Sequence, residues 1–301
     1  RQRQMCIRDR NILITGATGF VGRHLVRKLK KDFSLHLLVR EGSDLTGLED
    51  IPAFCFKEDI PALRQYLNKE KIEGIVHLAS LYIAQHREEQ IKDIILSNVY
   101  FGTALLEAAS KSEVKWFLNT GTIWQNYESD SPEYCPVNLY AASKQAFIDI
   151  AQYYTAVSPL RFMTLKLCDT YGPWDTRTKI LALFKRIAET GEELAMSPGE
   201  QQIDLLHIDD VIAGFRVLIR RLSEEKEQGE EYVLRADRPC SLRELAAVFE
   251  HVSGKKLNII WGGREYRLRE VMCPWKRGTV LPDWQPQISL QEGISDLLQH
   301  N

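Results

Sequence analysis

Residues 11–22 read Asn-Ile-Leu-Ile-Thr-Gly-Ala-Thr-Gly-Phe-Val-Gly, and this stretch decides the fold. Its apolar start predicts a short buried strand, and the residues after Gly22 carry a helical pattern. Between them Gly16, Gly19 and Gly22 stand at a GxxGxxG spacing. Such a turn from strand to helix presents backbone N–H groups to a pyrophosphate, so it predicts a dinucleotide-binding site. Alone the motif is a weak signal, because glycine turns of this kind also occur without a ligand.

The composition is that of an ordinary globular protein. The 301 residues suffice for one large α/β domain or for a core domain with a smaller lobe. The formal net charge of -2 gives no reason to expect nucleic acid or a membrane surface as a partner. The six cysteines are scattered without a CxxC or a Cys/His cluster. We therefore expect reduced thiols in a cytoplasmic protein, with no disulfide framework and no metal site.

Apolar strands alternate with helical segments along the rest of the chain. The expected strands are 34–40, 53–60, 74–80, 115–120 and 162–167, and the expected helices between them are 61–70, 91–110 and 140–157. This alternation predicts a doubly wound parallel sheet, a Rossmann-type α/β fold, that binds its ligands at the carboxyl ends of the strands. We treat the basic residues 1–10 as a foreign leader outside the fold.

Two units are expected from this pattern. Residues 11–167 should form the dinucleotide-binding domain, and residues 203–236 should return to it. Residues 168–202 and 237–301 should form a smaller C-terminal lobe that binds substrate.

The end of the second strand bears on the choice of cofactor. In NAD enzymes an acid stands there and binds the adenosine ribose, whereas here Arg40 ends the strand. An arginine suits a 2′-phosphate by its charge and its forked donors, so we expect NADP(H), with NAD(H) as the alternative. The other interpretation of Arg40 is a solvated loop residue. His77, inside the apolar strand 74–80, is predicted to be a core histidine.

Tyr140 and Lys144 lie four residues apart on the helix after the fifth strand, so they share one face. The lysine ammonium would lower the pKa of the phenol and bind the nicotinamide ribose, and Tyr140 would exchange a proton with a substrate oxygen. Thr120 at the end of the fifth strand would hold that oxygen, with Thr122 as the fallback. A YxxxK pair alone is common on helix surfaces, so its weight comes from the combination with the glycine turn.

Several further motifs complete the picture. They are Asp59-Ile60, His77-Leu78-Ala79-Ser80, Ser97-Asn98-Val99, Tyr140-Ala141-Ala142-Ser143-Lys144, Tyr171-Gly172-Pro173 and His207-Ile208-Asp209-Asp210-Val211. With the glycine turn, they make the chain from Asn11 to its end resemble the extended short-chain dehydrogenases/reductases. That family includes nucleotide-sugar epimerases, dehydratases and ketoreductases. Asn119-Thr120, Lys166-Leu167, Gly199-Glu200-Gln201 and Arg269-Glu270-Val271-Met272 are similar to the CDP-abequose and CDP-paratose synthases, NADPH-dependent reductases of a 4-keto-6-deoxysugar nucleotide.

The resemblance implies roles for particular residues. Asp59 and Ile60 would flank the adenine, and Thr120, Tyr140 and Lys144 would be the catalytic set. The expected cofactor contacts are Gly16, Thr18, Gly19, Phe20, Val21, Gly22, Arg40, Asp59, Ile60, Leu78, Ala79, Ser80, Tyr140, Lys144 and Leu167. The resemblance also suggests a homodimer formed through the helices 91–110 and 140–157.

The chain departs from the family's pattern at two places. Dehydratases of the family carry an Asp-Glu pair after the threonine, whereas Gly121-Thr122 stand here, which argues against 4,6-dehydratase activity. Relatives carry an arginine before the aspartate that leads to His207, whereas this chain has Ile203. Arg264, Arg267 or Arg269 could supply the missing diphosphate contact, or could lie on a solvated basic turn.

The loop 121–139 is long enough to suggest a function. Its aromatic and polar residues could contact a sugar or base, or could pack the two units together. The expected substrate contacts are Thr122, Trp124, Tyr127, Arg267 and Arg269.

These observations favour NADP(H)-dependent reduction of a keto group on a nucleotide-linked deoxysugar, with the proton from Tyr140. One alternative is a nucleotide-sugar 4-epimerase that retains its NAD(P). An alternative of another class is a regulator that binds a dinucleotide without catalysis, against which the presence of Thr120, Tyr140 and Lys144 argues.

Overall fold

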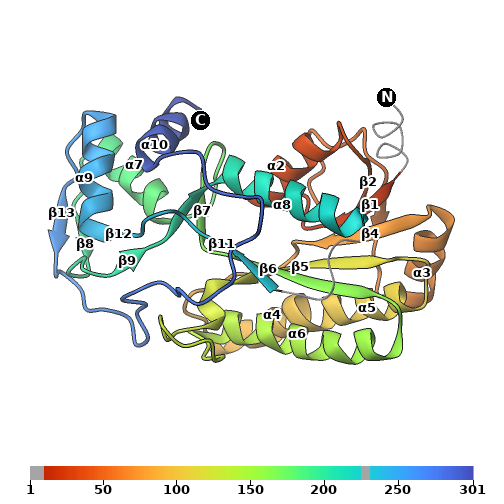
Figure 1. Cartoon of the computed structure of the whole chain (residues 1–301). Coiled ribbons are helices and arrows are strands. Elements are labelled where there is room, and N and C mark those ends of the chain that lie inside the picture. Colours follow the sequence, from red (N-terminus) through yellow and green to blue (C-terminus); the bar gives the residue numbers. More distant parts are fainter. Residues whose placement is uncertain (1–9, 225–230, 301) are drawn as a thin grey trace.

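The computed structural model describes residues 10–224 and 231–300, and a parallel sheet of seven strands forms its centre (Figure 1). The strands lie in the order β11-β6-β5-β4-β1-β2-β3. Their bounds are β1 Asn11–Thr15, β2 Ser34–Val39, β3 Ala53–Cys55, β4 Ile72–His77, β5 Trp116–Thr122, β6 Arg161–Leu167 and β11 Glu231–Leu234. The predicted doubly wound α/β fold is confirmed. The strand order reverses between β1 and β4, and such a reversal opens a crevice at the carboxyl ends of the strands.

Helices cover both faces of this sheet. α2 (Phe20–Leu29) and α8 (Ile208–Ser223) lie side by side on one face (Figure 1). On the other face lie α3 Ile60–Lys69, α5 Phe101–Ser110 and α6 Leu139–Val157. Successive side chains of a strand point to opposite faces, so Ile12 and Ile14 join one buried cluster and Leu13 joins the other.

The expected helix 91–110 is interrupted by a wider turn. α4 (Ile91–Ile95) passes into a π-helical turn, η2 (Leu96–Tyr100), before α5 begins. Single π turns often occur at functional sites. Here the turn contains Asn98, whose fully buried side chain bonds to the backbone of Leu81. The hydrophobic spacing could not show this turn, because its cause is a contact with another segment.

The second half of the molecule has its own buried cluster. Its helices are α7 Ile180–Thr190, α9 Leu242–Ser253 and α10 Leu290–Gln299. Its strands pair as β7 Asp169–Tyr171 with β10 Leu205–His207, β8 Leu194–Met196 with β13 Ile259–Trp261, and β9 Gln202–Ile203 with β12 Cys240–Ser241. These elements gather at one end of the central sheet (Figure 1).

The chain passes between the two halves more than once. After β6 it enters the second half, and α8 and β11 bring it back to the sheet, where β11 pairs with β6. The segment 203–207 stays in the second half, because β10 pairs with β7 there. Trp275 and Trp284, near the C-terminal end, pack in the buried cluster beneath α2 and α8. The boundary between the two halves is therefore crossed by more segments than the sequence pattern indicates.

Residues 1–9 of the expected leader and residues 225–230 lie outside the described residues. Arg10 belongs to the fold: it forms an ion pair with Glu73 at 3.1 Å, and its carbonyl oxygen accepts a hydrogen bond from Ser34 N. None of the helices in the described ranges is long and apolar enough to span a bilayer.

Candidate active site

Two glycines of the turn, Gly16 and Gly22, have no room for a side chain. Gly16 has φ +68°, and a Cβ there would lie 2.6 Å from Ala79 N. A Cβ on Gly22 would lie 2.1 Å from the Gly16 carbonyl oxygen. α2 begins at Phe20 with Gly19 as N-cap and without a side-chain cap, so its first N–H groups are available to a ligand. This cradle fits the pyrophosphate of a dinucleotide, as the spacing predicts.

The end of β4 lies directly beside this cradle. Thr15 Oγ1 accepts a hydrogen bond from Ala79 N at 3.1 Å and lies 2.8 Å from His77 Nδ1. His77 is fully buried, and burial lowers its pKa well below the usual value, so the prediction of a core histidine is confirmed. Leu78 and Ala79 are half-buried and Ser80 is exposed. The segment 78–80 thus lies directly against the glycine turn.

The other expected cofactor residues lie at the same edge of the sheet. Arg40 follows β2 and is exposed, and no described residue bonds to its guanidinium. Asp59 is the N-cap of α3 and accepts a hydrogen bond from Ala62 N at 2.9 Å. It therefore has a structural role besides the adenine contact that the resemblance implies. Leu167 ends β6 and is buried in the core.

Thr120 and Tyr140 belong to adjacent elements of the sheet half. Thr120 is in β5, and its Oγ1 is one of the buried side-chain oxygens without a partner among the described residues. Tyr140 is in the first turn of α6, whose N-cap Asn138 accepts a hydrogen bond from Ala141 N. Lys144, one turn further, is 1% exposed. An unpaired buried hydroxyl costs free energy, so the Thr120 oxygen is suited to a ligand that would pair with it.

The pKa of Tyr140 differs from the expectation. Burial raises the pKa of this phenol, and a hydrogen bond with the Ser80 side chain only partly opposes the rise. Burial also lowers the pKa of Lys144 to about 8. The expected lowering of the Tyr140 pKa by Lys144 is not observed, because desolvation disfavours the charged form of both groups. A raised pKa keeps the phenol of Tyr140 protonated.

A buried hydrogen-bond network holds α6 against the segment after β4. Asn98 Nδ2 donates to Ser143 Oγ at 2.9 Å, and Ser143 Oγ donates to the Tyr140 carbonyl oxygen at 2.7 Å. Asn98 also accepts from Leu81 N and donates to Leu81 O. The turn of α6 that carries Tyr140 is therefore fixed relative to residues 81–82.

Tyr82 is the functional candidate that the sequence analysis missed. Its ring meets the Tyr140 ring edge-on, with 5.0 Å between centroids, and lies 5.7 Å from the Trp124 ring. Tyr82 is 42% exposed, so the ring is accessible to a ligand as well as to Tyr140. The available signal was weak: one aromatic residue two positions after a run of small residues. Only the fold shows that it contacts the expected catalytic tyrosine.

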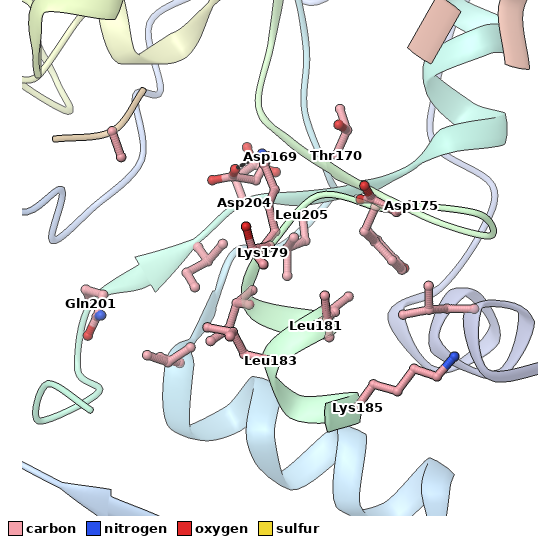
Figure 2. Close-up of a pocket in the computed structure, with 18 of the residues that line it drawn as sticks. Asp169, Thr170, Asp175, Lys179, Leu181, Leu183, Lys185, Gln201, Asp204 and Leu205 are labelled. Atoms are coloured by element: carbon pink, nitrogen blue, oxygen red, sulfur yellow. Dashed lines mark hydrogen bonds and ion pairs between the residues drawn. The ribbon is translucent and has the colours of Figure 1, made fainter. Parts of the chain in front are cut away.

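A cavity of about 570 Å³ lies between the two halves (Figure 2). Tyr82 and Trp124 line it from the sheet half, and Asp169, Lys179 and Gln201 line it from the second half. Of the expected substrate residues, Trp124 and Arg267 line this cavity. Thr122, Tyr127 and Arg269 are not among its lining residues.

Contacts with other side chains and with the backbone explain why these three residues do not line the cavity. The Thr122 hydroxyl accepts from Trp124 N at 3.3 Å and caps the short helix η3 (Ile123–Gln125). The Arg269 guanidinium lies 4.2 Å from the centre of the Tyr127 ring and donates to Cys135 Sγ. Arg269 and Tyr127 thus pack on each other instead of facing the cavity.

The fold and the site define an enzyme that uses a nicotinamide dinucleotide. Its glycine cradle follows β1, and Tyr140 in the first turn of α6 contacts Tyr82, which follows β4. Residues 12–234 match the model of the NAD dependent epimerase/dehydratase family. The chain belongs to this family, and it is an enzyme.

Individual proteins of known activity resemble the chain over nearly its whole length. It is 26% identical to the CDP-abequose synthase of Salmonella muenchen, over 96% of this chain and 97% of that protein. The UDP-glucuronic acid 4-epimerase of Bacillus cereus, solved with UDP-glucuronic acid and NAD, has a TM-score of 0.84 at 20% identity and covers 96% of this chain and 98% of its own. The UDP-glucose 4-epimerase of Thermotoga maritima has a TM-score of 0.83 at 20% identity, with the same coverage.

Proposed function

We propose that the protein is an NADP(H)-dependent reductase of a keto group on a nucleotide-linked deoxysugar. The observation that carries the proposal is the placement of Thr120 on β5 and of Tyr140 and Lys144 on α6, with Tyr140 in ring contact with Tyr82, which lines the cavity. The two residues that follow Thr120 are not acids. The similarity to CDP-abequose synthase, over nearly the full length of both chains, supports the same reaction class.

Three residues would act on the substrate and the cofactor. The bound dinucleotide supplies the hydride. Tyr140, whose pKa is raised, keeps its proton until a substrate oxygen takes it. Thr120 Oγ1, which has no partner among the described residues, would bond to that same oxygen and orient it. Lys144 would bind the ribose of the cofactor and stabilise the phenolate that Tyr140 becomes when it gives up its proton, because a positive charge close to a phenolate stabilises it.

Position 121 supports reduction over dehydration. A Cβ on Gly121 would lie within 2.9 Å of Thr164, Gln125 and Lys166, so no side chain fits there. The next side chain, Thr122, already caps Trp124 N. Position 121 therefore has no room for an acid, and position 122 holds a hydroxyl that is used as a helix cap.

Arg40 supports the preference for NADP(H). Its exposed guanidinium stands at the end of β2, where the adenosine ribose is bound in this fold. Asp44, a nearby acid, is held by Arg23 at 3.1 Å and accepts hydrogen bonds from both the backbone and the hydroxyl of Thr46. It is thus engaged elsewhere, which leaves Arg40 to meet a 2′-phosphate.

The test is consumption of NADPH in the presence of CDP-, UDP- and dTDP-linked 4-keto-6-deoxyglucose, compared with the same sugars without the nucleotide. Tyr140→Phe should lower turnover by about a hundredfold or more and leave NADPH binding unchanged. A Tyr140→Phe enzyme with full activity would contradict the role given to the phenol.

A second candidate is a nucleotide-sugar 4-epimerase, favoured by the close match of the backbone to two 4-epimerases of known structure. An epimerase regenerates its cofactor in each cycle and keeps it bound, whereas a reductase must exchange it. Release of the nucleotide by denaturation of the purified protein, followed by chromatography, separates the two. Stoichiometric NAD(P) with no net NADPH consumption would favour the epimerase.

We further propose a homodimer in the cytoplasm. Exposed apolar side chains of α4, η2 and α6, namely Ile91, Ile95, Leu96, Tyr100, Tyr153 and Val157, offer a surface for a second copy. The five cysteines of the described residues are all free, as reduced thiols of a cytoplasmic protein are. Residues 11–167 would bind the cofactor, and residues 168–202 and 237–301 would contribute most of the substrate site.

A further inference from the structure

One ion pair stands inside the cavity between the two halves. Lys179 Nζ lies 2.8 Å from Asp169 Oδ1, and each side chain is about a quarter exposed (25% and 28%). Both residues line the cavity, and Figure 2 shows them meeting there. A partly exposed pair of this kind contributes little net stability, on the order of 1 kcal/mol or less. It can therefore be exchanged for a stronger partner at low cost.

The pair lies one aromatic ring away from the catalytic tyrosine. Lys179 Nζ is 5.4 Å from the centre of the Tyr82 ring, and the Tyr82 ring is in edge contact with that of Tyr140. In a pyranose, C-4 and the anomeric carbon stand at opposite sides of the ring. A sugar with its C-4 oxygen at Tyr140 can therefore extend its anomeric substituent along Tyr82 toward Lys179. In a nucleotide sugar that substituent is a phosphate.

Other features on this side of the cavity also suit a polar ligand. Gln201 is 6% exposed and lines the cavity, and its Oε1 has no partner among the described residues. Lys179 is the N-cap of α7, an eleven-residue helix without a side-chain cap. The positive end of that helix dipole adds to the lysine charge.

The remaining buried acids of this wall have other partners. Asp175 is held by the Arg177 guanidinium at 2.7 Å, and Asp204 accepts from Ala236 N at 2.8 Å. Ile203, in the same wall, carries no charge. Asp169 and Lys179 thus form an ion pair inside the cavity that a ligand can separate, and Arg264 and Arg267 line the same cavity.

We infer that Lys179 binds the phosphate attached to the sugar, and that Asp169, which the phosphate displaces, then accepts a hydrogen bond from a hydroxyl of the sugar. This inference rests on the proposed nucleotide-sugar substrate. It makes sugar recognition depend on prior phosphate binding: Asp169 is occupied by Lys179 until a phosphate takes the ammonium. A sugar without a phosphate would meet a carboxylate that is already paired.

The first experiment measures binding of CDP and UDP to the NADPH-loaded enzyme by calorimetry. Lys179→Gln should weaken the diphosphates about tenfold or more, because the charge-assisted contact is lost, and Lys179→Arg should restore much of the affinity. Asp169→Asn should tighten the same diphosphates several-fold, since the competing carboxylate is gone. Lys256→Gln, which breaks an exposed ion pair with Glu250 remote from the cavity, is the matched control and should change nothing.

The second experiment separates the role of Asp169 toward the sugar. In NADPH oxidation with a nucleotide-linked keto-sugar, Asp169→Asn should lower kcat/KM about tenfold although it tightens the free diphosphate. This opposite response is not expected of a merely structural ion pair, whose loss would weaken both ligands. If Lys179→Gln does not fold, the isosteric Asp169→Asn still decides the inference by these two readouts.

The outcomes distinguish this inference from the proposed function. If keto-sugars are reduced but Lys179→Gln binds the diphosphates normally, or Asp169→Asn weakens them, the inference is wrong and the reductase assignment stands. If the diphosphates respond as described but no keto-sugar consumes NADPH, Lys179 is a phosphate ligand and the reductase assignment falls.

Discussion

Two regions of the molecule are built differently: the glycine turn, which we call the backbone wall, and the lining of the cavity between the halves, which we call the side-chain wall. On the cofactor side the glycine turn and the end of β4 present backbone, and they approach so closely that a Cβ on Gly16 would lie 2.6 Å from Ala79 N. On the substrate side the wall consists of long side chains from segments far apart in sequence, such as Tyr82, Lys179 and Arg267. A site made of backbone suits a ligand that is the same in all members of a family, such as the dinucleotide. A site made of side chains can differ from one member to another, as their substrates do.

The same contrast appears in how each wall is held. The cofactor side is fixed by strand pairing, with Thr15 opposite His77 in β1 and β4. The substrate side is held by exchangeable contacts, of which the Lys179–Asp169 ion pair is one. Substitutions should therefore have larger effects at the backbone wall, and we order the predictions accordingly.

The largest effect is expected from Gly16→Ala. The new Cβ would collide with the backbone of Ala79, and alanine is strained at φ +68°. We expect a loss of about 2–4 kcal/mol of stability together with loss of measurable NADPH binding. Thermal unfolding and fluorescence titration with NADPH check this.

Gly42→Ala is the matched control for that change. Gly42 also has a positive φ, +74°, but a Cβ there would meet nothing within 4 Å. Only the backbone strain of alanine at a positive φ remains, which should cost about 1 kcal/mol of stability, and NADPH binding should be kept. Equal effects of the two substitutions would show that close approach to β4 is not what requires Gly16.

The next effect concerns the pH dependence of stability. Burial lowers the pKa of Lys144 to about 8. Between pH 8 and the ordinary lysine value the unfolded chain binds a proton that the folded protein has released, so stability rises with pH across this window. Lys144→Met should remove a rise on the order of 3 kcal/mol. Urea unfolding of both proteins at a series of pH values measures it, and parallel profiles would contradict a buried Lys144.

Arg40→Ala tests whether one side chain on the backbone wall selects the cofactor. Loss of a charge-assisted contact to the 2′-phosphate should cost about 2 kcal/mol, or roughly thirtyfold in the Kd of NADPH. NADH carries no 2′-phosphate, so its Kd should stay unchanged. An equal loss of affinity for NADPH and NADH would mean that Arg40 does not bind the 2′-phosphate.

The smallest effect is expected at the side-chain wall, from Tyr82→Ala. Removal of the ring that contacts Tyr140 and Trp124 should lower kcat/KM about tenfold, the scale of a lost aromatic contact. NADPH binding should persist, and Tyr82→Phe should behave as wild type because the ring remains. A defect in cofactor binding would place Tyr82 on the other wall.

The predictability of the elements follows the same division. The strand Asn11–Thr15 and a helix after the glycine turn were predicted from local pattern, because the glycine spacing encodes the turn between them. The helix begins at Phe20, which is earlier than the pattern after Gly22 indicates. The π-helical turn at Leu96–Tyr100 was not, because Asn98 is turned inward by bonds to Leu81 and Ser143, which are distant in sequence. Thr122 and Arg269 were expected at the substrate, yet Thr122 caps the neighbouring Trp124 N and Arg269 packs on the distant Tyr127, and neither lines the cavity.

By itself the sequence determined the doubly wound sheet, the glycine cradle and the YxxxK helix, since each depends on residues close together in the chain. Only the tertiary structure decided that Tyr82 contacts Tyr140, that Asp169 pairs with Lys179 in the cavity, and that burial raises the pKa of Tyr140. The physical reason is that backbone conformation responds to neighbours in sequence, whereas desolvation and side-chain pairing depend on neighbours in space.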